Sequence, residues 1–228
     1  MKAFGIIVAG GHGKRMGTET PKQLLELGGK TIIEHTLAPF MSCSFINGIV
    51  ISASSEIIER IEKITYSLND IKPVIIVEGG RERQDSVLNG INAVPFNTDI
   101  IVIHDAVRPF ITADLITECI ITAEKRGSVS VMRPVKETIK IVCDGVIEET
   151  LDRSKLWITQ TPQAFRTEII KKAHEKAKND NFTGTDDCFL VERTGQKVYV
   201  IEGSDKNIKI TTPADLIIAE SILSSFNK

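Results

Sequence analysis

The sequence predicts an α/β fold in which helices cover both faces of a mostly parallel, twisted sheet. Short runs rich in Ile and Val alternate along the chain with segments whose apolar residues recur at helical spacing, and this alternation is typical of βαβ units. The chain has 228 residues, and neither an internal repeat nor a low-complexity linker divides it. We therefore expect residues 1–228 to form a single domain with a sizeable core.

Six strands and six helices are expected, in alternation. The expected strands are 3–9, 46–52, 74–78, 100–104, 128–133 and 198–201. The expected helices are 31–40, 55–68, 83–94, 112–126, 167–178 and 213–226. Ligands of such sheets bind beyond the carboxyl ends of the strands, so the residues that directly follow each strand are candidates for a functional site.

One segment breaks the alternation. Residues 138–142 and 146–150 have strand composition and are joined across Asp144-Gly145, a common hairpin turn. A lone two-stranded ribbon is marginal in water, so its apolar residues Ile139, Ile141, Val146 and Ile147 should pack on something. We expect residues 136–158 to form a β-arm that packs on a partner subunit, and a flap folded on its own domain is the alternative. Trp157 is expected to pack in the core beneath this hairpin.

Composition and charge exclude several function classes. The formal net charge is -2 with a pI of about 6.1, which argues against general nucleic-acid binding. No apolar run reaches the roughly 20 residues of a membrane span, and the chain opens on a core strand, so we expect neither membrane insertion nor export. The scattered cysteines favour free thiols in a reducing cytoplasm. They are Cys43, Cys119, Cys143 and Cys188.

The segment after the first strand carries the strongest chemical signal. Residues 10–17 read GGHGKRMG, and 21–23 read PKQ. Backbone without Cβ atoms lets consecutive N–H groups converge on phosphate oxygens, and Arg15 and Lys22 add positive charge. Met16 stands where a dinucleotide loop needs glycine, and Arg15 stands where a Walker loop needs Ser or Thr. The pattern predicts a nucleoside triphosphate site of neither type, and a tight turn with solvated basic residues is the alternative.

Several further segments, in the same order along the chain, closely resemble the 2-C-methyl-D-erythritol 4-phosphate cytidylyltransferase family. They are GGRERQDSV at 79–87, HDAVRPF at 104–110, DRSKLWITQTPQAF at 152–165, TDD at 185–187 and NIKIT at 207–211. The resemblance implies a three-layer α/β/α Rossmann-like nucleotidyltransferase fold, similar to GT-A folds, and a homodimer whose active sites are shared through the β-arm. The sister family of ribitol-5-phosphate cytidylyltransferases shares part of the pattern and is the alternative.

The activity that the resemblance implies is transfer of a cytidylyl group from CTP to 2-C-methyl-D-erythritol 4-phosphate. The products would be pyrophosphate and 4-diphosphocytidyl-2-C-methyl-D-erythritol, an intermediate of non-mevalonate isoprenoid synthesis, with Mg²⁺ or another divalent cation as cofactor. Residue chemistry agrees with this, because a phosphate monoester is largely a dianion at neutral pH and needs no general base. None of the chain's histidines need therefore transfer a proton.

Residue roles follow from the same resemblance. Arg15 and Lys22 would stabilise the transition state, Arg153 and Lys209 would hold the acceptor phosphate, and Asp105 would bind acceptor hydroxyls and help to place Mg²⁺. The CTP site would be lined by Ala9, Gly10, Gly11, Gly80, Ser86 and Ala106. The acceptor pocket would be completed by Arg108, Thr138, Thr161 and Thr185.

Other interpretations of these residues stay open. Asp105 could cap the element after its strand, and we favour a cap and first-turn charge over a metal pair for Asp186-Asp187. The sequence His-Asp-Ala-Val at 104–107 lacks the Asp-x-Asp pattern of glycosyltransferases, and the basic pair at 15 and 22 argues against a non-catalytic module. The run at 8–11 has valine and glycine where many family members carry proline and alanine, and Arg81 stands where they often carry Asp. These departures do not touch the reacting atoms but could alter how the nucleotide is held.

Overall fold

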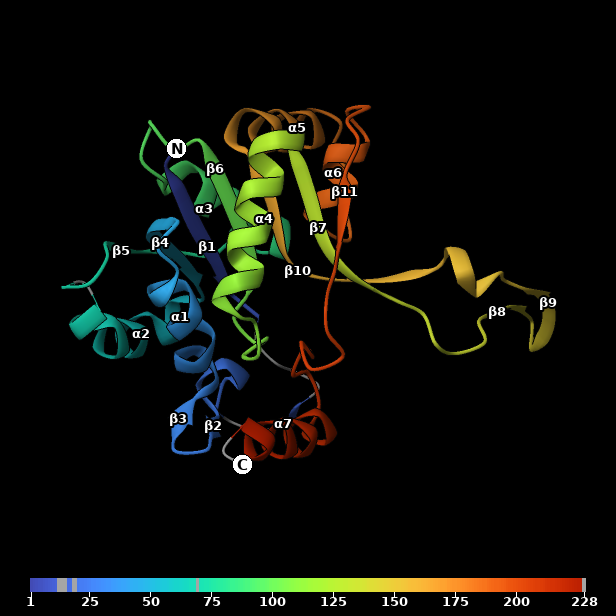
Figure 1. The fold of residues 1–228 in the computed structure, drawn as a ribbon, viewed down its shortest axis with the longest axis horizontal. Coiled ribbons are helices and arrows are strands. Elements are labelled where there is room, and N and C mark those ends of the chain that lie inside the picture. Colours follow the sequence, from blue (N-terminus) through green and yellow to red (C-terminus); the bar gives the residue numbers. More distant parts are fainter. Residues whose placement is uncertain (12–15, 18–19, 69, 227–228) are drawn as a thin grey trace.

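The computed structural model describes residues 1–11, 16–17, 20–68 and 70–226, and a seven-stranded sheet lies at its centre. The strand order is β11-β7-β10-β6-β1-β4-β5 (Figure 1). These strands are β1 (Ala3–Ala9), β4 (Ile46–Ala53), β5 (Val74–Glu78), β6 (Ile100–Asp105), β7 (Ser128–Pro134), β10 (Trp157–Arg166) and β11 (Tyr199–Glu202). β10 runs antiparallel to β6 and β7, and the other pairs are parallel. The predicted, mostly parallel sheet is confirmed.

Helices cover both faces of this sheet. They are α1 (Ile32–Ser42), α2 (Ile58–Thr65), α3 (Arg83–Ala93), α4 (Ala113–Arg126), α5 (Thr167–Asn179) and α6 (Asp187–Glu192), whereas α7 (Pro213–Phe226) lies away from the sheet faces. Successive strand residues point to opposite faces, so Ile7 and Ile51 join one core cluster with α1, α2 and α4, while Ile6 and Val50 join another with α3, α5 and α6. The three-layer arrangement is therefore as expected.

β10 is the main element that sequence analysis missed. Its residue Pro162 has no N–H to donate, and the pairing with β7 shifts register between Thr159 and Gln163, around that proline. A proline and polar residues within a run argue against a strand, which is why the pattern gave no signal. The expected helix 55–68 is also divided, into the 3₁₀ helix η3 (Ser55–Ile57), α2 and the 3₁₀ helix η4 (Tyr66–Leu68).

A small third cluster lies where the first helix begins and the chain ends. The short strands β2 (Glu26–Leu27) and β3 (Lys30–Thr31) pair with each other, and α7 packs near them. The cluster comprises Leu27, Ile32, Val107, Ile210 and Ala219. The Ile210 N–H also donates to the Val107 carbonyl at 2.9 Å. The loop that carries residue 209 is thereby fixed beside the end of β6.

The β-arm projects from the body between β7 and β10 (Figure 1). Its strands β8 (Lys140–Cys143) and β9 (Val146–Thr150) are joined by Asp144 and Gly145, whose φ angles of 48° and 80° suit a tight hairpin turn. Every residue of β8 and β9 is exposed, so the alternative of a flap packed on its own domain is wrong. The expected burial of Trp157 is also wrong within this chain, because that residue is 41% exposed at the base of the arm.

Candidate active site

A cavity of about 260 Å³ lies beyond the carboxyl ends of β1 and β6. All residues expected to bind CTP line it, together with Lys22, Asp105 and Lys209. A Cβ on Gly80 would stand 2.1 Å from the Asp85 Cβ, and one on Gly10 would stand 3.0 Å from the Ser86 Oγ. Glycine at these two positions therefore lets the wall of the cavity pack closely against the start of α3.

Local hydrogen bonds hold this wall in place. The Ser86 Oγ accepts from the Gly80 N–H at 3.0 Å and donates to the Glu82 carbonyl at 3.1 Å. The buried Gln23 amide, which also lines the cavity, donates to the Ala9 carbonyl at 2.7 Å. Gln23 neighbours Lys22 in the PKQ run, so the sequence could have indicated its position but not its partner. Arg15, with residues 12–14, lies outside the described residues.

Asp105, at the end of β6, is surrounded by three basic side chains. Its carboxylate lies 3.1 Å from the Arg83 Nε, 2.8 Å from the Lys209 Nζ and 3.5 Å from the Arg108 Nε. Burial alone would raise the pKa of Asp105, but Arg83, Lys209 and Arg108 outweigh burial and hold the pKa well below its usual range. The group is a permanent anion within a positively charged cluster that suits phosphate ligands.

A buried histidine fixes the loop after β6. Because the Arg108 carbonyl can only accept, the His104 Nε2, 3.1 Å away, must carry the hydrogen. Burial lowers the pKa of His104 to about 4, so the ring is neutral and its Nδ1 accepts from the Thr161 hydroxyl at 3.0 Å. The same hydroxyl accepts from the Asp105 N–H at 3.1 Å. His104 and Thr161 thus orient Asp105 and Arg108.

A second cavity of about 210 Å³ adjoins the first and shares Arg83, Asp105 and Lys209 with it. It is also lined by Arg108, Thr161 and Thr185, all of which the resemblance assigns to the acceptor. The Arg108 guanidinium donates to the Asn207 carbonyl at 2.8 Å, which fixes its position at this cavity. Two cavities with a charged junction could therefore hold two anionic reactants side by side.

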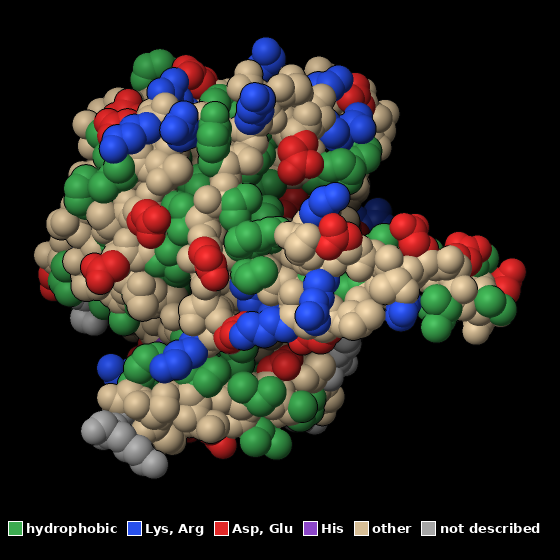
Figure 2. Space-filling view, turned by 45° about the vertical axis from the view of Figure 1, so that its right-hand side comes forward, with side chains coloured by type: hydrophobic (Ala, Val, Ile, Leu, Met, Phe, Trp, Pro, Cys, Tyr) green, Lys and Arg blue, Asp and Glu red, His purple; other side chains and the backbone are tan. Residues whose placement is uncertain are grey.

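Two expected acceptor residues lie elsewhere in the described chain. Thr138 and Arg153 are exposed on the arm and line neither cavity. Arg153 begins the 3₁₀ helix η5 (Arg153–Lys155), and its guanidinium donates to the Lys136 carbonyl of the same arm at 2.9 Å. Figure 2 shows this arm standing clear of the body, with acidic and apolar side chains toward its tip. Within one chain, these residues do not join the group around Asp105.

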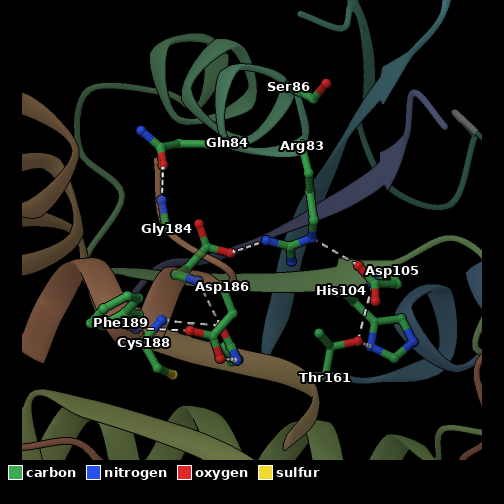
Figure 3. A network of polar contacts seen from close by, with 12 residues as sticks. Arg83, Gln84, Ser86, His104, Asp105, Thr161, Gly184, Asp186, Cys188 and Phe189 are labelled. Atoms are coloured by element: carbon green, nitrogen blue, oxygen red, sulfur yellow. Dashed lines mark hydrogen bonds and ion pairs between the residues drawn. The ribbon is translucent and has the colours of Figure 1, made fainter. Parts of the chain in front are cut away.

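Sequence analysis missed a buried network beside the site. Figure 3 shows Arg83 between Asp105 and the loop that begins α6, and its partner there is Asp187 at 2.7 Å. Asp186 caps α6 by accepting from the Phe189 N–H at 2.8 Å, as favoured from the sequence. Asp187 does more than supply the expected first-turn charge, because it is buried and paired. The sequence shows an arginine at the start of a helix but cannot show which distant carboxylate it meets.

Metal and membrane features can be judged within the described ranges. No group of three or more His, Cys, Asp or Glu side chains there could hold a metal ion by itself. Asp105 is the carboxylate that lines both cavities. None of the helices in the described part of the chain is long and apolar enough to cross a bilayer.

Comparison with known proteins agrees with the geometry. The family model of 2-C-methyl-D-erythritol 4-phosphate cytidylyltransferase matches residues 3–225. The chain is 44% identical over 227 residues to the protein of that name from Geobacter metallireducens, covering 98% of each chain. It is 46% identical over 226 residues to the one from Dictyoglomus thermophilum, covering 98% of this chain and 97% of the other.

Solved structures give the same result. The chain is similar to 4-diphosphocytidyl-2C-methyl-D-erythritol synthase from Anaerococcus prevotii, with a TM-score of 0.87, 30% identity and 98% of each chain covered. It is also similar to the Thermus thermophilus cytidylyltransferase, with a TM-score of 0.80, 27% identity, and 98% of this chain and 100% of the other covered. The chain therefore belongs to the 2-C-methyl-D-erythritol 4-phosphate cytidylyltransferase family and is a nucleotidyltransferase.

Proposed function

We propose that this chain transfers a cytidylyl group from CTP, bound in the first cavity, to 2-C-methyl-D-erythritol 4-phosphate, bound in the second. The observation that carries the proposal is the junction of the two cavities at Asp105 and Lys209. At that junction the acceptor phosphate can meet the α-phosphorus of CTP, and pyrophosphate leaves. The product is 4-diphosphocytidyl-2-C-methyl-D-erythritol, an intermediate of isoprenoid precursor synthesis.

The chemistry requires positioning and positive charge more than proton transfer. The acceptor phosphate is already largely ionised at neutral pH, and His104, which directly precedes Asp105 on β6, is buried, neutral and committed to two hydrogen bonds. Negative charge grows on the reacting phosphoryl oxygens. Lys22 lines the first cavity, and we assign to it and to Arg15 the stabilisation of that charge.

The acceptor phosphate is held by Lys209 and, in this proposal, by Arg153 of a second copy of the chain. Two observations support a shared site. Arg153 and Thr138 line neither of the two cavities described above, and the arm exposes Val142, Val146 and Ile147 by 58–66%. Burying the same ribbon on both copies gives a two-fold, isologous homodimer. A planar guanidinium can then grip the phosphate through two parallel hydrogen bonds.

Magnesium fits this donor set. Mg²⁺ is commonly held by one or two carboxylates together with substrate phosphates and water, and Asp105 supplies one carboxylate that stays ionised. A bound Mg²⁺ would neutralise triphosphate charge and orient the reacting groups. Asp105 would hold it from the protein side, while its backbone stays tied to Thr161.

The test is a substrate matrix. The purified protein is incubated with each nucleoside triphosphate, with Mg²⁺ and with either 2-C-methyl-D-erythritol 4-phosphate or ribitol 5-phosphate, and pyrophosphate release is followed. We expect release with CTP and the methylerythritol phosphate. Release that requires ribitol 5-phosphate would favour the sister activity, and equal release with all triphosphates would contradict cytosine recognition.

A further inference from the structure

Arg83 forms salt bridges with two carboxylates, Asp105 at the cavity junction and Asp187 in the protein interior. It is the first residue of α3, and its guanidinium donates to the Asp105 Oδ1 at 3.1 Å (Figure 3). It also donates to the Asp187 Oδ2 at 2.7 Å. The other oxygen of Asp187 lies 3.2 Å from the His174 Nε2. The side chains of Asp187 and His174 are each 1% exposed, so the far end of the bridge is fully enclosed.

The buried carboxylate anchors Arg83 from behind. Burial alone would raise the pKa of Asp187, but Arg83 and His174 outweigh burial and lower it, so Asp187 stays ionised. An ionised carboxylate in the interior is costly without a partner. Arg83 is that partner, and burial, which alone would lower its pKa, is outweighed by Asp187 and Asp105, which raise it. If Arg83 moved away, the buried Asp187 carboxylate would lose its salt bridge with a cationic partner.

The basic side chains around Asp105 are held unequally. Arg83 is fixed by Asp187, and Arg108 by the Asn207 carbonyl. Lys209 has a side chain that is 39% exposed, on a four-carbon stem, and it pairs with Asp105 at 2.8 Å. Of these cations, Lys209 is therefore the one that can turn toward an incoming phosphate while the others stay in place.

We propose that Arg83 is a positioning residue for the acceptor: anchored by Asp187, it keeps Asp105 neutralised and in place when Lys209 leaves Asp105 for the acceptor phosphate. This inference rests on the proposed function. Without Arg83, Asp105 attracts Lys209 more strongly, and the acceptor phosphate must compete for that lysine. Loss of Arg83 therefore weakens use of the acceptor more than use of CTP.

The kinetic test is Arg83→Gln, measured with each substrate varied in turn. We expect the KM for 2-C-methyl-D-erythritol 4-phosphate to rise by about ten- to a hundredfold, the range of a charge-assisted hydrogen bond, and the KM for CTP to change by much less. The matched control is Arg193→Gln, which removes a surface ion pair with Asp180 at 2.9 Å and should leave both constants within about twofold. Equal losses for both substrates would overturn the proposal.

A second pair of variants separates positioning from folding. Arg83→Gln strands the Asp187 charge and should lower thermal stability, whereas Arg83→Gln combined with Asp187→Asn removes both charges and should recover much of it. We expect the high acceptor KM to persist in this double variant. Recovery of acceptor use together with stability would make Arg83 merely structural. Arg83→Lys keeps one charge for Asp187 but cannot bridge both carboxylates, so its acceptor KM should also rise. An inactive wild-type protein would instead contradict the proposed function, which is a distinct result.

Discussion

The cavity junction and the arm both carry basic side chains expected at the acceptor phosphate, but they hold them in different ways. Lys209 and Arg108 pair with Asp105, a buried carboxylate whose backbone is tied to Thr161. Arg153 lies on an exposed 3₁₀ helix and donates to a carbonyl of its own arm. At the junction, the Asp105 carboxylate finds its cationic partners Arg83, Arg108 and Lys209 within one chain. The arm contacts the body near its base, where Lys136 pairs with Asp205, but its strands β8 and β9 are exposed throughout, so in the proposed function its contribution depends on a second chain.

The largest expected effect tests whether the first cavity performs the chemistry. Lys22→Ala should lower kcat by about a hundred- to a thousandfold, because a preorganised charge at the developing phosphoryl anion is lost. Binding of CTP, measured by calorimetry, should weaken much less. Arg15→Ala should behave alike. Unchanged turnover in Lys22→Ala would remove that residue from the chemistry and contradict the role proposed for it in the first cavity.

Acid should destabilise the fold through His104, beside the junction. The pKa of His104 is about 4 in the folded protein, whereas its ordinary value, which applies to the unfolded chain, is 6.5. Between these pH values the unfolded chain therefore binds more protons than the folded one. The free energy of unfolding should therefore be fully retained above pH 6.5 and fall by about 3 kcal/mol toward pH 4.

Denaturant unfolding across this pH range checks the expected slope, with His104→Asn as the comparison. Asn can still accept from Thr161 but does not titrate, so the variant should be less stable overall and show a shallower decline. Asp105 and Asp187, whose pKa values are lowered, add acid sensitivity to both proteins alike. Identical slopes in the two proteins would rule out His104 as the source.

Mixing two inactive variants tests the arm directly. A Lys22→Ala chain and an Arg153→Ala chain should each be poorly active, but after subunit exchange half of the sites in the mixed dimers would receive both intact residues. Random exchange then restores about a quarter of wild-type activity. Verified exchange without recovery would mean that Arg153 does not complete a partner's site.

The smallest effect concerns the apolar face of the arm. Ile147 is 60% exposed, and Ile147→Ala should weaken dimerisation by about 1 kcal/mol, as for a peripheral interface residue. Sedimentation at several concentrations measures this change. Ile71→Ala, at an isoleucine that is 64% exposed away from the arm, is the matched control. A dimer unaffected by Ile147→Ala but weakened by Ile71→Ala would place the interface elsewhere.

Local sequence patterns were sufficient to predict the layered fold and the edge of the sheet at which ligands would bind. Its β-branched runs and helical periodicity are local patterns, so β1, β4, β5, β6 and β7 appear close to their expected bounds. The glycine loop and the turn at Asp144-Gly145 are local as well, because each depends on backbone freedom within a few residues. Such features can be predicted without knowing what the chain packs against.

The tertiary structure alone decided which distant groups meet. β10 is a strand because it pairs with β6 and β7 on either side. Its proline and glutamines gave no local strand pattern, so the sequence did not predict it. The bridge from Asp105 through Arg83 to Asp187 joins residues up to 104 positions apart, and no local pattern encodes such a contact. The same holds for Trp157, which the sequence placed in the core and the fold leaves exposed. Burial and ion pairing are set by long-range packing, which the local periodicity of apolar residues in the sequence cannot determine.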